Sequence, residues 1–296
     1  MMQQSNQTLT PPPQSREAAD MATLDAGRPL RRIHIGTLAQ LAQGAPWRMG
    51  LMHALPHHLF LWVTRGQGRG VIMGKRTGIG THNALLIPAH TLFSLDLGKQ
   101  GFGLAVQIPT EANVTFPDTD QHLRLRDVLV QGELTSILDT MQREQTSARP
   151  YGEEAAVAHA QLLSVWLRRT LINTPPESAR PLAAERLVRS YCTLLERDYR
   201  SGRPMADYAE ALNVTPTHLT RSCRQCAGLT AADILTQRSL HAARDLLETS
   251  DVPINRISQW LGFGSAAYFT RFIQHHTTKT PSDLRKLAKS RPSSVS

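Results

Sequence analysis

The pattern of apolar and polar positions changes twice along the chain. Residues 1–28 are polar, contain three consecutive prolines and show no apolar period, so we expect a disordered leader. From about residue 31 to residue 109, short apolar stretches alternate with glycine-rich turns. This texture predicts many short strands in a small barrel or sandwich. The predicted strands cover residues 58–63, 70–73, 84–88 and 103–108.

After residue 117, the apolar residues have the spacing of helices instead of strands. In residues 121–146 and 153–172, apolar side chains recur every three or four positions, as at Leu134, Leu138 and Met141. We therefore predict two amphipathic helices behind the barrel. Two interpretations stay open, because such helices could form a dimer interface or pack on the barrel of their own chain. Residues 173–181 are predicted to be a linker by their composition.

Residues 182–288 are predicted to be helical almost throughout, and they contain an internal repeat. Residues 215–221 align with residues 265–271 at an offset of 50 positions, and each segment opens with a threonine or serine suited to an N-cap. A short amphipathic helix and a tight turn precede each segment. This order is the helix-turn-helix pattern. We expect units at 205–227 and 254–276, a linker helix at about 233–249 and a tail at 289–296.

The second helix of each unit has two chemically different faces. The mostly apolar faces should point to the domain core; they carry Leu219, Ser222, Cys223 and Cys226, and Phe269, Phe272, Ile273 and His276. The opposite faces carry Thr217, Thr220, Arg221 and Arg224, and Ala267, Thr270, Arg271 and Gln274. Arginine can bind guanine, glutamine can bind adenine, and threonine can contact a base edge or a thymine methyl group. We therefore predict that these faces bind double-stranded DNA.

The length of the linker helix is compatible with two such reading helices on one duplex. Roughly 15 residues, at 234–248, span roughly 22 Å as a helix. A connector of this size could hold the two helices near one DNA turn apart, roughly 34 Å, on one face of the duplex.

The charge distribution agrees with this assignment. The 296-residue chain carries 33 Lys and Arg against 24 Asp and Glu, a formal net charge of +9. Residues 1–179 contain 16 basic and 14 acidic side chains, whereas residues 180–296 contain 17 and 10, so most of the positive field lies in the repeat region. No uncharged apolar run of about 18 residues and no secretory signal pattern occurs, which predicts a cytoplasmic protein with no membrane partner.

Several motifs in this region match a known family. They include the Leu-Gly-Phe turn at 261–263, the Tyr-Phe-Thr-Arg sequence at 268–271 and the Thr-Pro-Ser sequence at 280–282. The first unit contributes Leu-Thr-Arg at 219–221 and Gly-Leu-Thr at 228–230. With these motifs, about a third of the chain resembles the DNA-binding domain of AraC/XylS-type transcriptional regulators.

The resemblance implies a sequence-specific, effector-responsive regulator that acts as an activator on RNA polymerase. It places the base-facing positions at Thr217, Thr220, Arg221, Ala266, Ala267, Thr270 and Arg271. Some positions depart from the family pattern: Cys223 replaces an aromatic residue, Ser239 an arginine, Ser258 an alanine, and Thr277-Thr278 a Phe-Gly pair. The last change leaves the second reading helix without its usual glycine cap.

The N-terminal part is similar to the cupin-type sensing domain of many such regulators. The matching pieces are residues 66–70 and 85–90. The similarity implies an α+β chain of two domains. Residues 29–172 would form the first domain, which consists of a barrel that holds a small effector and of the helices after it, which make a homodimer. His58, Trp62, His82 and His90 are expected to face the barrel interior as candidate effector-binding residues. A core or surface role is the alternative for each of them.

Other classes of function find less support in the residues. A cupin-type metal enzyme needs clustered His and carboxylate ligands, but the barrel segment has no His-x-His, and His57 and His58 would point to opposite faces of a strand. We therefore expect no catalytic residue, no metal and no cofactor. A barrel without any ligand, in an architectural or interaction protein, is a further alternative.

Cys223 and Cys226 have the spacing of a redox or zinc motif. A second pair of cysteines is missing, and both thiols lie on the apolar face of their helix, so we expect two buried, unreactive side chains. A redox-responsive DNA-binding regulator is the alternative that this spacing leaves open.

Overall fold

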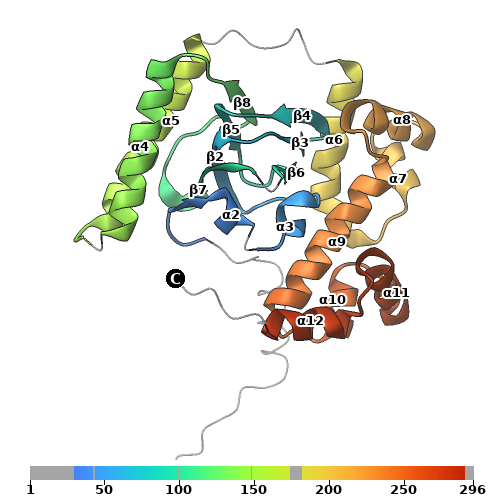
Figure 1. Ribbon diagram of the computed structural model, residues 1–296. Coiled ribbons are helices and arrows are strands. Elements are labelled where there is room, and N and C mark those ends of the chain that lie inside the picture. Colours follow the sequence, from blue (N-terminus) through green and yellow to red (C-terminus); the bar gives the residue numbers. More distant parts are fainter. Residues whose placement is uncertain (1–29, 43, 99, 148, 174–181, 291–296) are drawn as a thin grey trace, which may run out of the picture.

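The computed structural model describes residues 30–42, 44–98, 100–147, 149–173 and 182–290. The predicted leader at 1–28, most of the predicted linker and the tail after residue 290 lie outside these residues. A β-rich N-terminal domain carries two long helices on one side and faces a helical C-terminal domain on the other (Figure 1). The predicted two-domain α+β class is therefore confirmed.

Two antiparallel sheets form the N-terminal domain. Five strands pair in the order β1-β7-β2-β5-β8 and three in the order β4-β3-β6. Their bounds are β1 (His34–Thr37), β2 (His57–Arg65), β3 (Gly68–Ile72), β4 (Lys75–Ile79), β5 (Asn83–Ile87), β6 (Phe93–Asp96), β7 (Phe102–Pro109) and β8 (Gln121–Arg124). The four predicted strands correspond to β2, β3, β5 and β7. The others are short, and pairing with a neighbour rather than their own apolar pattern makes them strands.

The central strand β2 is buried on both faces. Leu59, Leu61 and Val63 lie in the apolar cluster between the two sheets. Phe60 and Trp62 point to the other face, into the cluster that the helices cover. Successive side chains of a strand alternate between faces, so β2 is an uninterrupted apolar run because both faces of its sheet are covered.

The helices α4 (Val128–Thr146) and α5 (Gly152–Asn173) pack on the outer face of the five-stranded sheet. Leu134, Leu138 and Leu163 are buried there. The prediction that the first helix begins at residue 121 is wrong: residues 121–124 are β8, paired with β5. The helix begins only after Asp127, whose carboxylate accepts the Leu129 N–H at 2.8 Å as an N-cap.

Helices make up most of the C-terminal domain. Their bounds are α6 (Ala183–Asp198), α7 (Met205–Ala211), α8 (Pro216–Ala227), α9 (Ala231–Thr249), α10 (Ile254–Trp260), α11 (Ala266–Thr277) and α12 (Pro281–Ser290). The predicted helix-turn-helix units coincide with α7–α8 and α10–α11, and α9 is the linker helix. Two short helices, α2 (Leu38–Leu41) and α3 (Trp47–Gly50), belong to the N-terminal domain. Among the described residues, no helix is long and apolar enough to cross a membrane.

The two domains share one apolar cluster at their junction. Met52 and Leu92 of the N-terminal domain are fully buried in the cluster that the C-terminal helices form. Gly74, in the turn between β3 and β4, lies so close to Val188 of α6 that a Cβ would overlap it. Ion pairs also cross the junction: Arg48–Asp245 at 2.9 Å, Arg189–Asp120 at 2.8 Å and Lys75–Glu185 at 3.4 Å.

Candidate DNA-binding surface

Both reading helices, α8 and α11, begin at the side-chain caps that the sequence predicts. The Thr215 hydroxyl accepts the His218 N–H at 3.2 Å, and Pro216 occupies the first helical position. The Ser265 hydroxyl accepts the Tyr268 N–H at 3.1 Å. These caps satisfy backbone donors that a helix start leaves free, and they fix the start of each reading helix.

The turn before each reading helix contains a residue with positive φ. Asn213 has φ 55° in the first turn, and Gly262 has φ 75° in the second. Gly262 also lies directly against the Arg200 carbonyl, where a Cβ would overlap the oxygen. Glycine is therefore required in the second turn for both its conformation and its close packing.

The two reading helices end in the same way, although their sequences differ. Gly228 (φ 73°) follows α8 and donates its N–H to the Arg224 carbonyl at 3.0 Å. Thr278 (φ 59°) follows α11 and donates its N–H to the Gln274 carbonyl at 2.9 Å. The two caps are 50 positions apart, as in the sequence repeat. Thr278 thus adopts the left-handed conformation that glycine normally supplies, and α11 keeps the length of α8.

The inner faces of the reading helices differ from the prediction at their C-terminal ends. Leu219, Cys223, Phe269 and Ile273 are buried in the domain core, as expected. Cys226 and Phe272 are only half-buried, and His276 is exposed. Cys226 and His276 lie in the last turns of their helices, whereas Phe272 lies near the middle of α11 and packs at the edge of the core.

The thiols on α8 are poor nucleophiles. Burial raises the pKa of Cys223 to about 12, and burial together with Glu185 raises the pKa of Cys226. Reactive cysteines need a stabilised thiolate, so this environment does not favour the redox alternative.

The outer faces of both reading helices are open to solvent at equivalent positions. Seven of the nine predicted DNA-contact residues are exposed: Thr217, Arg221, Arg224, Ala266, Ala267, Arg271 and Gln274. Thr220 and Thr270 are half-buried, and the Thr270 hydroxyl donates to the Ala266 carbonyl at 2.9 Å. Figure 1 places α8 near the upper end of α9 and α11 beside its lower part, next to α10, both on the side of the molecule away from α4 and α5.

A buried ion pair that the sequence did not reveal supports the linker helix. The Arg238 guanidinium, on α9, donates to both carboxylate oxygens of Glu196 on α6, at 2.6 and 2.8 Å. It also lies 3.9 Å from the ring centroid of Tyr199. Arg238 is buried, and Ser239 beside it is buried as well. The family's arginine at position 239 is thus absent, while the adjacent arginine holds α9 against α6.

The four predicted effector-binding residues do not form one site. Trp62 and His82 stack with ring centroids 5.9 Å apart, while His58 lies near Phe116, with ring centroids 5.6 Å apart. Burial and the nearby His90 lower the pKa of His58. The prediction that Trp62 faces the barrel interior is wrong, because the alternation of β2 turns it to the helix-covered face. His82 and His90 are exposed rather than interior.

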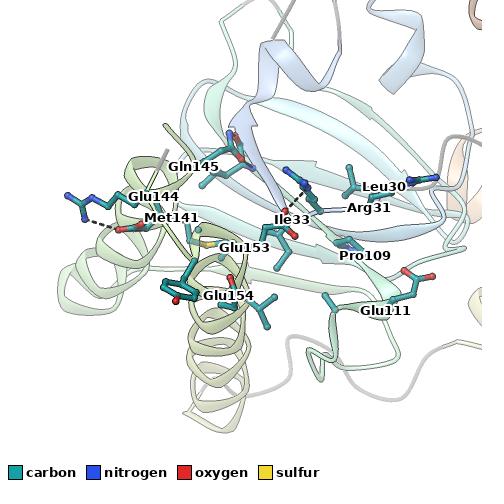
Figure 2. Close-up of a pocket in the computed structure, with 18 residues that line it drawn as sticks. Leu30, Arg31, Ile33, Pro109, Glu111, Met141, Glu144, Gln145, Glu153 and Glu154 are labelled. Atoms are coloured by element: carbon teal, nitrogen blue, oxygen red, sulfur yellow. Dashed lines mark hydrogen bonds and ion pairs between the residues drawn. The ribbon is translucent and has the colours of Figure 1, made fainter. Parts of the chain in front are cut away.

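Two large grooves lie elsewhere on the N-terminal domain. One, of about 920 Å³, is bounded by the chain before β1 and by the facing ends of α4 and α5; Figure 2 shows Glu111 and Glu144 on opposite sides of it. The other, of about 1410 Å³, lies between β8, α4 and α5 and includes the buried Trp166. None of the four predicted residues lines either groove. The alternation of strand residues alone could not locate grooves that helix packing creates.

Within the residues that the structure describes, no group of three or more His, Cys, Asp and Glu side chains is placed to hold a metal ion.

Comparison with known proteins shows what the C-terminal domain is similar to. Residues 208–287 match the family described as "Helix-turn-helix domain". The chain is 26% identical over 200 residues to the uncharacterized HTH-type transcriptional regulator YijO of Escherichia coli (strain K12). This match covers 66% of this chain and 66% of that protein. It is 29% identical over 140 residues to the HTH-type transcriptional regulator GlxA of Rhizobium meliloti (strain 1021), covering 45% of this chain and 43% of that protein.

The chain also has a weak structural similarity to a solved protein. Unsaturated fatty acid-bound ToxT from Vibrio cholerae superposes over 86% of this chain and 95% of that chain, with a TM-score of 0.41 and 14% identity. The similar sequences named above are transcriptional regulators. A bifunctional transcriptional activator and DNA repair enzyme, AdaA of Bacillus subtilis (strain 168), is 23% identical over 95 residues, covering 32% of this chain and 45% of that protein. The match at residues 208–287 and the similar regulators confirm the predicted resemblance of about a third of the chain to AraC/XylS-type regulators.

Proposed function

We propose that this chain, which carries an AraC/XylS-type helix-turn-helix domain, is a sequence-specific transcriptional regulator that places α8 and α11 in successive major grooves. The observation that carries the proposal is the equivalence of the two outer faces: both are exposed, start from the same kind of cap and end at caps 50 residues apart. The 19 residues of α9 span ~28 Å as a helix, a length compatible with two groove sites one DNA turn apart.

The two reading helices offer different chemistry to DNA. Arg221 and Arg224 on α8 present two guanidinium groups. On α11, Arg271 presents a guanidinium group and Gln274 presents an amide. Ala266 and Ala267 can offer only apolar contact, for instance to a thymine methyl group. The side-chain chemistry therefore assigns most polar base recognition to α8, Arg271 and Gln274.

Selection of binding sites from random-sequence duplexes by the full-length protein tests this proposal. The expected result is a motif with two half-sites about 10 base pairs apart, and an affinity that falls steeply with salt. Enrichment of no motif at all, with the same salt-dependent binding to every duplex, would contradict sequence-specific recognition.

We also assign an effector-sensing role to the N-terminal domain, with activation through RNA polymerase as the family resemblance implies. The two grooves, of about 920 and 1410 Å³, are large enough to hold a small molecule. His58, Trp62, His82 and His90 remain candidate contacts, now as two separate pairs. A thermal-shift screen of small planar acids tests the role, since a ligand of the folded state raises Tm and a chain without a sensing site gives no shift.

The homodimer that we propose uses the outer surface of α4 and α5. Val128, Leu129 and Ile172 are 75%, 78% and 83% exposed, and Leu162 is also exposed. Large apolar side chains grouped on one surface are typical of an interaction site. The inner faces of the same helices pack on their own barrel, so a dimer would use the opposite, exposed faces.

A further inference from the structure

An arginine of the N-terminal domain lies beside the end of the first reading helix. Strand β4 packs against α8, and an Arg76 guanidinium nitrogen lies 3.8 Å from the position that a Cβ on Gly228 would occupy. Figure 1 shows β4 at the side of its sheet that is next to α6 and α8. This contact joins two segments that are about 150 positions apart in the sequence.

The fold fixes the direction in which Arg76 points. Arg76 is the cross-strand partner of Val71, so both side chains stand on the same face of the three-stranded sheet. Val71 packs against the apolar cluster of the C-terminal domain, and so does Met73 at the adjoining turn. The face that carries Arg76 is therefore the face turned toward the C-terminal domain.

Gly228 continues the outer face of α8. At 100° per residue, position 228 falls between the directions of Arg221 and Arg224. The guanidinium of Arg76 thus extends the line of positive charge that these two arginines begin. Arg76 is exposed, and its guanidinium makes no hydrogen bond or ion pair with the residues that the structure describes.

The position suits a phosphate rather than a base. Position 228 lies seven residues beyond Arg221, ~10 Å along the helix axis. The major groove is ≈12 Å wide, so a helix that reads bases through Arg221 brings position 228 to the phosphates at the edge of the groove. Arginine binds phosphate oxygens through charge-assisted hydrogen bonds.

We propose that Arg76 binds a DNA phosphate next to the groove that α8 occupies, so that the N-terminal domain is part of the DNA-binding surface. This inference rests on the proposed function, since it takes α8 as a reading helix. The junction between the domains, with Gly74 packed on Val188, then sets the position of one phosphate contact.

The test measures DNA affinity by fluorescence anisotropy at several salt concentrations. It compares the full-length parent protein with its Arg76→Ala, Arg76→Lys and Arg143→Ala variants. Each protein is tested on a selected site and on a scrambled duplex. Arg143 is the matched control, because it is an exposed arginine of α4 that bonds only within its own helix in the described structure. One phosphate contact contributes about 0.9 to the slope of log affinity against log salt, which is about fivefold in affinity near 0.15 M salt.

The expected result is that Arg76→Ala lowers the salt slope by about 0.9 and the affinity about fivefold, on both duplexes. Arg76→Lys should keep the slope, and Arg143→Ala should match the parent protein. Equal slopes for Arg76→Ala and Arg143→Ala would overturn the proposal. So would a loss of affinity with unchanged slope and a lowered Tm, because that result indicates a structural role at the end of α8. Failure of the parent protein to prefer its selected site would instead count against the proposed function.

Discussion

The imidazole rings of His53 and His241 stack across the junction between the domains, with ring centroids 4.4 Å apart and planes 7° from parallel. His53 donates through Nδ1 to the Leu51 carbonyl at 2.8 Å, and His241 donates through Nε2 to the Arg48 carbonyl at 3.1 Å. Both acceptors are backbone carbonyl groups of the N-terminal domain. The linker helix α9 contacts the N-terminal domain through two neutral rings.

Acid should weaken this contact. Burial lowers the pKa of His53 to about 4, and burial, His53, Arg238 and Arg48 lower the pKa of His241. The unfolded chain therefore binds protons more tightly, so the stabilisation is complete above pH 6.5 and is lost as the pH falls toward 4. For His53 the free energy of unfolding should fall by up to about 1.4 kcal/mol per pH unit in this window. Urea unfolding at a series of pH values measures it.

His53→Phe is the variant that isolates this titration, because it keeps an aromatic ring beside Phe93 and His241. The pH dependence of its unfolding should be flatter than that of the parent between pH 6.5 and 4. His275→Gln, at an exposed position, should behave like the parent. A parent-like profile for His53→Phe would rule out His53 as a source of the acid sensitivity.

Removing Glu196 should destabilise the C-terminal domain strongly. Glu196→Ala leaves the Arg238 guanidinium buried without its carboxylate, at a cost of about 3–5 kcal/mol in unfolding free energy. Lys289→Ala breaks an exposed ion pair with Asp251, and it should lower the unfolding free energy far less than Glu196→Ala does. Chemical denaturation of both variants measures the contrast. Similar costs for the two would show that the buried pair contributes no more than a surface pair.

Thr278→Gly should stabilise the second helix-turn-helix unit. A β-branched residue at φ 59° costs about 1–2 kcal/mol, whereas glycine loses about 0.5–1 kcal/mol more conformational entropy on folding. The net gain in unfolding free energy is then about 0.5–1 kcal/mol. Gly228→Thr, the reciprocal change on α8, should destabilise by a similar amount. The thermal midpoints of the two variants should move in opposite directions, and a shared direction would contradict this explanation.

Leu129→Asp should shift the proposed dimer to monomer. The side chain is 78% exposed on the outer surface of α4, so the substitution leaves the core of the single chain unchanged and charges the proposed interface. Sedimentation equilibrium of the parent and the variant measures the effect. Asp139→Leu, an exposed position further along α4, serves as the control for an altered helix surface. A parent that is monomeric at micromolar concentration would refute the proposed interface.

The helix-turn-helix units could be predicted from the sequence because local signals fix them. Thr215, Pro216 and Ser265 mark helix starts, and the three- to four-residue apolar spacing marks the inner faces. The strands β2, β5 and β7 were found because apolar runs mark strands that are buried on both faces.

The features that were missed depend on tertiary contacts. Strand β4 has no apolar alternation and exists through its pairing with β3. The Arg238–Glu196 pair joins residues 42 positions apart, and the His53–His241 stack joins two domains. The face of Trp62 cannot be predicted from the sequence, because β2 is apolar at every position from 59 to 63 and no alternation indicates which face meets the helices.

Sequence-specific recognition by α8 and α11 is tested by enrichment of genomic DNA fragments with the full-length protein, beside the Arg221→Ala/Arg271→Ala double variant at physiological salt. Each substitution should cost about 1–3 kcal/mol at the cognate site and relax specificity there. The expected result is a motif with two half-sites about one turn apart that the double variant no longer recovers. Salt-sensitive binding without a motif, equal in both proteins, would contradict it, because the basic domain would then act only as an electrostatic surface.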